Sequence, residues 1–242
     1  MQVIRRPFFS YYGSKWRAAK HYPAPQHASI VEPFAGGAGY ALHHASRNVT
    51  LYDIDPAIIG VWNYLIDASE RDICRLPVKF ESTEHLRIAQ EAKWLIGFWL
   101  GIGSQHPRLT PATSMRKRLA GLTPVGTGGG NNVSSFWCET TRDTLASQVK
   151  YIRHWKAFCQ SFASIRNKKA TWFVDPPYDC KAGRAYRFHD IDYKKLAGWC
   201  QDRRGQTIVC ETAGAEWLPF QSLKSIRSVR GWSKEVIYTC TN

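Results

Sequence analysis

Residues 29–55, SIVEPFAGGAGYALHHASRNVTLYDID, decide the fold of this chain. The stretch opens with a short apolar strand and passes through the glycine-rich turn 35–39 into a helical segment. It closes with a second apolar strand that ends in Asp53-Ile54-Asp55. A strand, a glycine turn, a helix and a second strand make a βαβ unit, the building block of parallel sheets. Ligands of such sheets bind beyond the carboxyl ends of the strands, so we expect a site there.

The same alternation of strands and helices continues beyond this unit. Residues 170–174 and 206–210 predict buried strands, and residues 194–203 predict a helix between them. Near the C-terminus, residues 226–229 and 236–240 are expected to pair as a hairpin. The pattern therefore predicts an α/β fold with a doubly wound, mostly parallel sheet, helices on both faces and a terminal antiparallel hairpin.

A shift in composition near Cys74 interrupts this alternation. Residues 75–165 are expected to form an inserted, mainly helical region. Within it, residues 104–135 are rich in Gly, Ser, Thr, Pro and Asn, which is typical of a flexible loop. The remaining residues, 1–74 and 166–242, are then expected to form a single domain that carries the insert.

Bulk composition restricts the class of partner and the compartment. The 242 residues carry a formal net charge of +14, which favours a polyanionic partner such as nucleic acid. The seven cysteines show no Cys-x-x-Cys spacing and no Cys/His spacing typical of zinc, so we expect reduced thiols and no metal. The N-terminus lacks the apolar segment of a signal peptide, and no run of about 18 apolar residues occurs. We expect a cytoplasmic protein without a membrane span.

The βαβ unit carries the signal for a cofactor. Glycines at 36, 37 and 39 allow the backbone to approach a ligand closely, and the helix that follows favours a carboxylate or phosphate. Asp53, at the end of the second strand, is placed to accept hydrogen bonds from both hydroxyls of a ribose. NAD and S-adenosylmethionine both fit this pattern. The methyl donor is favoured because the phosphate-reading glycine pattern is incomplete, and because another acid, Asp175, ends a later strand.

Asp175-Pro176-Pro177-Tyr178 is the second chemically informative segment. It follows the apolar run 170–174, and its prolines fix φ and remove two backbone donors. The carbonyls and the carboxylate of this stiff lip are then available to accept hydrogen bonds from an amine, and the tyrosine ring offers a flat face. Such a site suits a planar heterocycle with an exocyclic NH₂, which indicates chemistry on a nucleobase.

Four segments, taken together and in order, resemble the Dam family of DNA adenine methyltransferases, the α-group enzymes with a DPPY motif. They are Tyr11-Tyr12-Gly13-Ser14-Lys15, residues 32–39 (EPFAGGAG), residues 51–56 (LYDIDP) and Asp175-Pro176-Pro177-Tyr178. The resemblance covers roughly residues 5–70 and 158–242, with the target-reading insert before the last motif. It implies a Rossmann-like S-adenosylmethionine-dependent methyltransferase fold. The chain departs from the family pattern at Tyr11 (Trp in the family), Ser14 (Gly) and Asp55 (commonly Asn).

The resemblance also implies a role for each matching residue. The methyl donor S-adenosylmethionine would be bound by Tyr11, Tyr12, Gly13, Lys15, Glu32, Pro33, Phe34, Gly36, Gly37, Asp53, Ile54 and Asp175. Catalysis would rest on Asp175, Pro176, Pro177 and Tyr178. The carboxylate and the Pro176 carbonyl would accept hydrogen bonds from the adenine amine, and Tyr178 would stack on the base. Neither a metal nor a covalent nucleophile is required, and the base must be flipped out of the duplex.

Basic residues near these motifs are candidates for contacts with DNA phosphates. They are Arg116, Lys117 and Arg118 in the insert, and Lys181, Arg184 and Arg187 in the loop after the lip. That loop, residues 179–190, is also a candidate cover for the site. We therefore expect double-stranded DNA as the partner.

The sequence thus predicts a site-specific DNA adenine methyltransferase that transfers a methyl group to the 6-amino group of adenine. Two alternatives stay open: a methyltransferase of another base amine (cytosine, or guanine or adenine in RNA), and a catalytically dead nucleic-acid-binding relative. Residues 75–165 are not recognisably similar to the insert of the family, so no target sequence follows. A monomeric enzyme of bacterial or phage origin is expected by resemblance.

Overall fold

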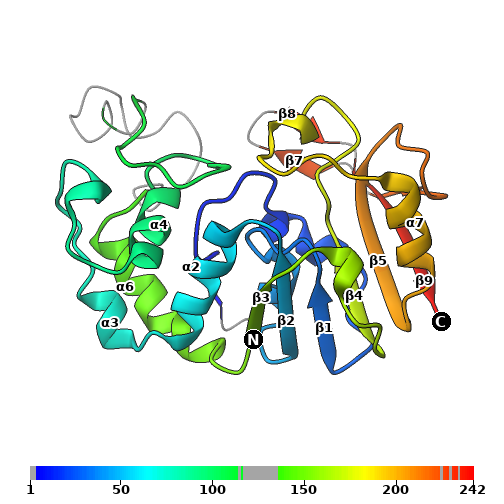
Figure 1. Ribbon diagram of the computed structural model, residues 1–242, viewed down its shortest axis with the longest axis horizontal. Coiled ribbons are helices and arrows are strands. Elements are labelled where there is room, and N and C mark those ends of the chain that lie inside the picture. Colours follow the sequence, from blue (N-terminus) through cyan, green and yellow to red (C-terminus); the bar gives the residue numbers. More distant parts are fainter. Residues whose placement is uncertain (1–3, 114–115, 117–135, 224–225, 229–230, 234) are drawn as a thin grey trace.

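A seven-stranded sheet runs through the middle of the protein (Figure 1). The computed structural model describes residues 4–113, 116, 136–223, 226–228, 231–233 and 235–242. The strand order is β3-β2-β1-β4-β5-β9-β6. The first five strands in this order are parallel to their neighbours, and β9 runs antiparallel to both β5 and β6. The strands are β1 Ser29–Glu32, β2 Asn48–Asp53, β3 Lys156–Cys159, β4 Ala170–Val174, β5 Gly205–Thr212, β6 Gln221–Ser222 and β9 Glu235–Thr241.

This strand order confirms the expected fold class. The order reverses between β1 and β4, and the antiparallel β9 lies between β5 and β6. These two features define the Rossmann-like fold of class I S-adenosylmethionine-dependent methyltransferases. In such a sheet, the reversal point opens a crevice at the carboxyl ends of the strands, which is where ligands bind.

The two faces of the sheet are covered by different helices. Helices α1 and α2 contribute to the core on one face and α7 to the core on the other. Because side chains alternate along a strand, Phe173 belongs to the first core, whereas its neighbours Trp172 and Val174 belong to the second. The helices are α1 Gly39–His43, α2 Pro56–Asp67, α3 Glu70–Cys74, α4 Gln90–Phe98, α6 Glu139–Gln148 and α7 Tyr193–Gln201. Short 3₁₀ turns occur at Lys15–Arg17, Ala19–His21, Thr83–His85, Val149–Tyr151, Phe162–Ser164 and Gly183–Ala185.

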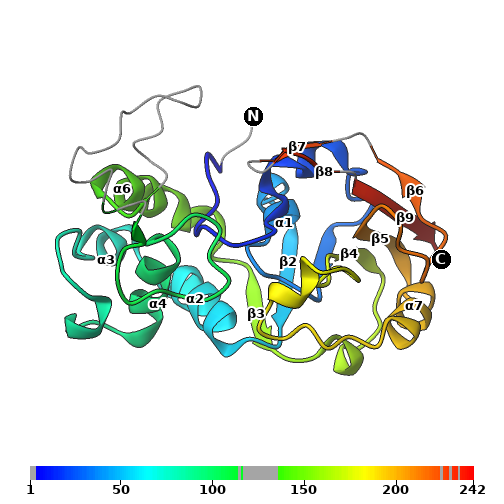
Figure 2. The same ribbon diagram turned by 90° about the horizontal axis from the view of Figure 1, so that it is seen from above.

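The inserted helices extend the core on the α2 side instead of forming a separate one. Figure 2 shows α4 and α6 of the insert grouped with α3 beside α2. Leu95 of α4 and Leu145 of α6 are fully buried in the same cluster as Trp62 of α2. Trp62 also contacts Phe9, with ring centroids 5.4 Å apart, so the N-terminal segment joins this core. The use of residues 75–165 for target recognition stays a prediction.

One segment of the expected insert is instead a strand of the main sheet. The mainly helical insert was expected to extend to residue 165, but Lys156–Cys159 forms β3 and pairs in parallel with residues 50–53 of β2. A strand of four residues, of which only Ala157 is buried, is too short to show an alternating pattern of apolar and polar residues. The predicted flexible loop, residues 104–135, lies largely outside the described residues.

The C-terminal pairing also differs from the expectation. Residues 226–229 were expected to pair with residues 236–240, but β7 (Ile226–Ser228) pairs with β8 (Gly231–Ser233) in a separate two-stranded sheet. This leaves β9 to pair with the full length of β5. Closing a short loop costs less entropy than closing a long one, so the nearest segments pair with each other. None of the described helices combines the length and apolar character that a membrane span requires.

Candidate active site

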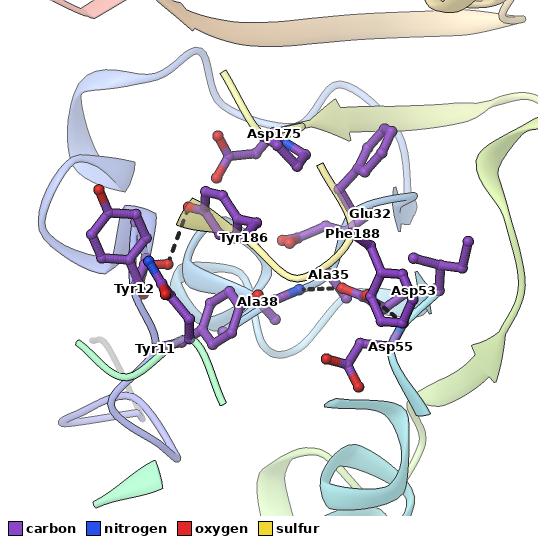
Figure 3. A pocket seen from close by; sticks show the side chains of 18 of the residues that line it. Tyr11, Tyr12, Glu32, Ala35, Ala38, Asp53, Asp55, Asp175, Tyr186 and Phe188 are labelled. Atoms are coloured by element: carbon purple, nitrogen blue, oxygen red, sulfur yellow. Dashed lines mark hydrogen bonds between the residues drawn. The ribbon is translucent and has the colours of Figure 1, made fainter. Parts of the chain in front are cut away.

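A cavity of about 360 Å³ opens at the carboxyl ends of β1, β2 and β4 (Figure 3). Asp53 and Asp55 lie on one side of it and Tyr11 and Tyr12 on the opposite side. Asp175 stands at a third side, at the end of β4. The cavity therefore joins the βαβ unit, the N-terminal motif and the acidic lip, which are far apart in sequence.

The glycine turn is shaped by the N-terminal segment that packs on it. Gly36 has a positive φ of 43°, and a Cβ there would lie 2.8 Å from the ring of Tyr11. A Cβ on Gly39 would overlap the backbone nitrogen of Trp16. These glycines were expected to make room for a ligand. In the structure, the space at Gly36 and Gly39 admits residues of the motif that begins at Tyr11, and that motif then forms the far wall of the cavity.

Asp53 is held by backbone N–H groups on both of its carboxylate oxygens. Gly36 N donates to Oδ2 at 3.0 Å, and Asp55 N donates to Oδ1 at 2.9 Å. Burial raises the pKa of Asp53 to about 6, although these two hydrogen bonds oppose the rise. Each oxygen keeps a further lone pair. The carboxylate is thus oriented by the turn and can still accept from a pair of ribose hydroxyls.

Two further acids near the βαβ unit are also held by the backbone. Glu32, at the end of β1, is almost fully buried and accepts from Ala41 N at 2.7 Å. Its burial raises its pKa well above the usual range. Asp55 is the N-cap of α2 and accepts from Ala57 N at 2.8 Å. This half of the site therefore presents three acids with fixed positions.

Asp175 is paired with Lys15 across the cavity. Lys15 Nζ lies 2.8 Å from Asp175 Oδ1 and donates to the carbonyl of Gly13 at 3.1 Å. Burial raises the pKa of Asp175 to about 6, although the charge of Lys15 opposes the rise. Burial alone would lower the pKa of Lys15, but the charges of Asp175 and Glu235 outweigh it and raise that pKa. The pair is ionised at neutral pH.

The rest of the lip has contacts that sequence reasoning did not anticipate. Pro177 offers its carbonyl to the hydroxyl of Tyr193, at 2.7 Å. Tyr178 donates its hydroxyl to Glu235 Oε2 at 2.6 Å, and Lys15 Nζ lies 4.6 Å from the centroid of the Tyr178 ring. One face of this ring is therefore in contact with a cation, and base stacking on Tyr178 stays a prediction.

A second cavity, of about 710 Å³, adjoins the first. Tyr178 and Glu235 line this second cavity and not the first, whereas Lys15 and Tyr186 line both. The two cavities therefore meet beside the ion pair between Lys15 and Asp175. A planar ring in the second cavity would have an aromatic wall and a buried carboxylate beside it.

The loop between β4 and α7 covers the first cavity, and residues 186–191 line it. Tyr186 donates its hydroxyl to the carbonyl of Tyr12 at 3.3 Å, and the two rings lie 5.3 Å apart (Figure 3). Gly13 lies beside that hydroxyl with a positive φ of 70°, and a Cβ there would overlap the Tyr186 oxygen. The structure thus places the loop after the lip over the site.

Most residues expected at the donor site surround the first cavity, although their roles stay predictions. All twelve except Pro33 line it. Of the lip residues, Asp175 and Pro177 line the first cavity, Tyr178 lines only the second, and Pro176 lines neither. Several residues that line the cavities were not assigned to the site from the sequence, among them Ser14, Asp55, Gln105, Tyr186, Phe188 and Glu235. Ser14 lies within a recognised motif, but Gln105 and Glu235 reach the cavities through the fold and have no local signal.

The residues expected to contact DNA lie in two regions. Lys181, Arg184 and Arg187 are exposed on the loop that covers the cavity, and Arg187 also lines the cavity. Arg116 is exposed in the insert, whereas Lys117 and Arg118 lie outside the described residues. Among the described residues, no group of three or more His, Cys, Asp or Glu is arranged to hold a metal ion.

Comparison with known proteins identifies no family for this chain. No protein-family model matches the chain, and no curated protein matches its sequence. Among solved structures, it is similar to a candidate methyltransferase, YhhF, from Escherichia coli, with 11% identity and a TM-score of 0.36 over 88% of this chain and 75% of that chain. It is also similar to a candidate methylase, HI0767, from Haemophilus influenzae, with 12% identity and a TM-score of 0.33 over 88% of this chain and 80% of that chain. Similarity this low says nothing about activity.

Proposed function

We propose that this chain is an S-adenosylmethionine-dependent methyltransferase that acts on the exocyclic 6-amino group of adenine in DNA. The observation that carries the proposal is the position of Asp175. Its carboxylate lies at the end of β4, on the wall of the cavity built by the glycine turn and Asp53. The adjoining second cavity, which Tyr178 and Lys15 line, offers room for a flat base, and Lys15 pairs with that carboxylate.

The first cavity fits the donor in its chemistry as well as its place in the fold. Asp53 has the paired acceptors that a ribose diol needs, and the first cavity also contains Asp175. Carboxylates favour a cationic ligand over a neutral one. When bound, the donor would supply an electrophilic methyl group on a sulfonium, with a neutral thioether as leaving group. Asp53 would hold the ribose, and the turn that begins at Gly36 would lie against the methionine end.

The acceptor amine needs activation, because its lone pair is delocalised into the purine ring. Hydrogen bonds accepted from both N–H groups draw the nitrogen toward a pyramidal geometry and localise that pair. Asp175 and the carbonyl of Pro176 are the proposed acceptors, and Asp175 can take the proton that the methylated nitrogen releases. This is catalysis by positioning and electrostatic complementarity. Tyr193 keeps the lip in place through its bond to Pro177.

The polar edge of adenine is inaccessible to such a lip inside a duplex, so the proposal requires the base to be extruded. The net charge of +14 and the exposed Lys181 and Arg184 beside the cavity support a nucleic-acid substrate. We expect Arg187, on the same loop, to contact the backbone next to the extruded base.

The test is transfer of a labelled methyl group to duplex DNA, to RNA and to single-stranded DNA, followed by analysis of the nucleosides. N6-methyladenine in DNA is the expected product. Label in cytosine, or in RNA alone, would replace the proposed substrate with one of the alternatives. An absence of transfer together with an absence of S-adenosylmethionine binding in calorimetry would contradict the enzymatic proposal altogether.

A further inference from the structure

Glu235 is a buried acid at the edge of the second cavity. It is the first residue of β9, and it pairs with Thr212 at the end of β5. Only 8% of its surface is exposed. Thr212, which faces Glu235 across the strand pair, is polar, and Glu235 lies in none of the sequence motifs. A buried carboxylate is costly unless polar partners compensate it, so its contacts indicate what it does.

Two tyrosines from distant segments donate to the same oxygen of Glu235. The hydroxyl of Tyr178 lies 2.6 Å from Oε2, and the hydroxyl of Tyr22 lies 3.2 Å from it. Tyr22 is anchored independently, because its ring packs edge-on against Phe173 at 5.2 Å. Tyr178 thus has its ring fixed at two ends: its backbone belongs to the stiff lip, and its hydroxyl is held by Glu235.

Glu235 also acts on the ion pair at the centre of the site. Lys15 lies over the ring of Tyr178, and the charges of Asp175 and Glu235 both raise its pKa. The same charge of Glu235 contributes to the raised pKa of Asp175. A chain of contacts therefore links Glu235 to the proposed amine acceptor: Glu235 binds the Tyr178 hydroxyl, the Tyr178 ring lies against Lys15, and Lys15 pairs with Asp175.

We propose that Glu235 is a positioning residue for methyl transfer: it holds the Tyr178 ring in place beneath Lys15, the ionic partner of Asp175. The proposal rests on the proposed function, because it concerns the acceptor half of the same site. Glu235 lines only the second cavity, so it should affect the target and not the donor.

Glu235→Gln is the informative variant, because glutamine keeps the size and an acceptor oxygen but loses the charge. We expect kcat to fall about 10- to 100-fold, the range associated with loss of a charge-assisted contact. Donor affinity measured by calorimetry should stay within about two-fold of the wild type. Loss of the negative charge lowers the pKa of Asp175, so the acid limb of the pH–kcat profile should move to lower pH. A merely structural role would not move that limb.

Two further variants make the test specific. Tyr22→Phe removes another hydrogen bond to the same Glu235 oxygen but leaves the Tyr178 bond intact, so its kcat should fall less than that of Glu235→Gln. Tyr178→Phe removes the shared bond from the other end. In the double variant with Glu235→Gln, kcat should fall by less than the product of the two single fold-decreases, because the effects of residues in contact are not independent.

Several outcomes would overturn the proposal. An active wild type, with kcat and acid limb unchanged in Glu235→Gln, would contradict it while leaving the methyltransferase function intact. Should Glu235→Gln fail to fold, as judged by thermal melting, an unchanged kcat in Tyr178→Phe would contradict it equally. A wild type that transfers no methyl group to any nucleic acid would remove both this proposal and the proposed function.

Discussion

The two halves of the site are built in different ways. In the proposed donor half, the three acids of the βαβ unit are held by backbone N–H groups from nearby residues: Glu32 by Ala41, Asp53 by Gly36 and Asp55, and Asp55 by Ala57. The acceptor half is held mainly by side chains that come from remote segments. Its acids are in contact with Lys15 and with the hydroxyls of Tyr22 and Tyr178.

This difference has a chemical counterpart. Backbone donors on a turn hold Asp53 in one orientation whatever is bound, which suits a cofactor that always presents the same ribose. Side-chain partners such as Lys15 have several rotatable bonds, which under the proposed function suits a pocket that receives and releases a base. The donor half should therefore respond to substitution through affinity, and the acceptor half through turnover.

The largest effect is expected at the acceptor half. Asp175→Ala should lower methyl transfer by at least about 100-fold, because it removes the acceptor of the amine proton. Donor binding in calorimetry should persist. Asp175→Asn, which keeps the shape, serves as the companion variant, because alanine leaves Lys15 buried without its ionic partner. Full activity in both variants would exclude the proposed mechanism.

The matching change in the donor half is Asp53→Ala. Donor affinity should fall about 10- to 100-fold, because the charged acceptor of the ribose hydroxyls is lost. At saturating donor, kcat should stay close to the wild-type value. Titration calorimetry and steady-state kinetics measure the two quantities separately. An unchanged affinity would show that Asp53 does not hold the donor.

The dependence on pH offers a third comparison. Burial raises the pKa of Asp175 to about 6, and in the proposed mechanism its carboxylate form accepts the amine hydrogen bond. As the pH falls through about 6, the acid is protonated, so kcat should fall about ten-fold per pH unit below that value. The kcat of the wild type, measured against pH at saturating donor, should show this fall. A kcat that does not change between pH 5 and 7 would show that protonation of Asp175 does not affect the rate-limiting step.

Packing between the glycine turn and the N-terminal segment can be tested with a pair of glycines. Gly39→Ala should destabilise the protein by about 1–3 kcal/mol, because a Cβ there overlaps the backbone of Trp16. Gly198, exposed in α7 with no atom near its missing Cβ, is the matched control. Gly198→Ala should stabilise the protein by about 0.5–1 kcal/mol. Denaturant unfolding measures both, and equal effects would contradict the packing role of Gly39.

The smallest effect concerns the loop over the first cavity. Lys181→Glu combined with Arg184→Glu should weaken DNA binding at low salt and reduce the slope of log affinity against log salt by about 0.9 per lost phosphate contact. Lys169→Glu is the control, because Lys169 is exposed just before β4, at the end of that strand opposite the site. If the control weakens binding as much as the loop variant, the loop has no special role.

Particular elements show where sequence reasoning succeeded and where it did not. The turn that begins at Gly36, the acid Asp53 and the end of β4 at Asp175 were all located correctly, because strong local patterns mark them. The strand β3 was missed, since four edge residues carry no pattern. The predicted pairing of residues 236–240 with residues 226–229 was wrong, because pairing between strands depends on competition among several segments. Glu235 could not be found, because its place beside Tyr178 follows from that pairing.

The amino-acid sequence alone determined the βαβ unit, its glycine turn and the acidic lip, because each depends on residues that are neighbours along the chain. Only the tertiary structure decided that Lys15 pairs with Asp175, that Glu235 holds Tyr178, and that the loop carrying Tyr186 covers the cavity. Those contacts join side chains from separate strands and loops. They exist only once the order of the strands in the sheet has been set, and that order is a property of the whole chain.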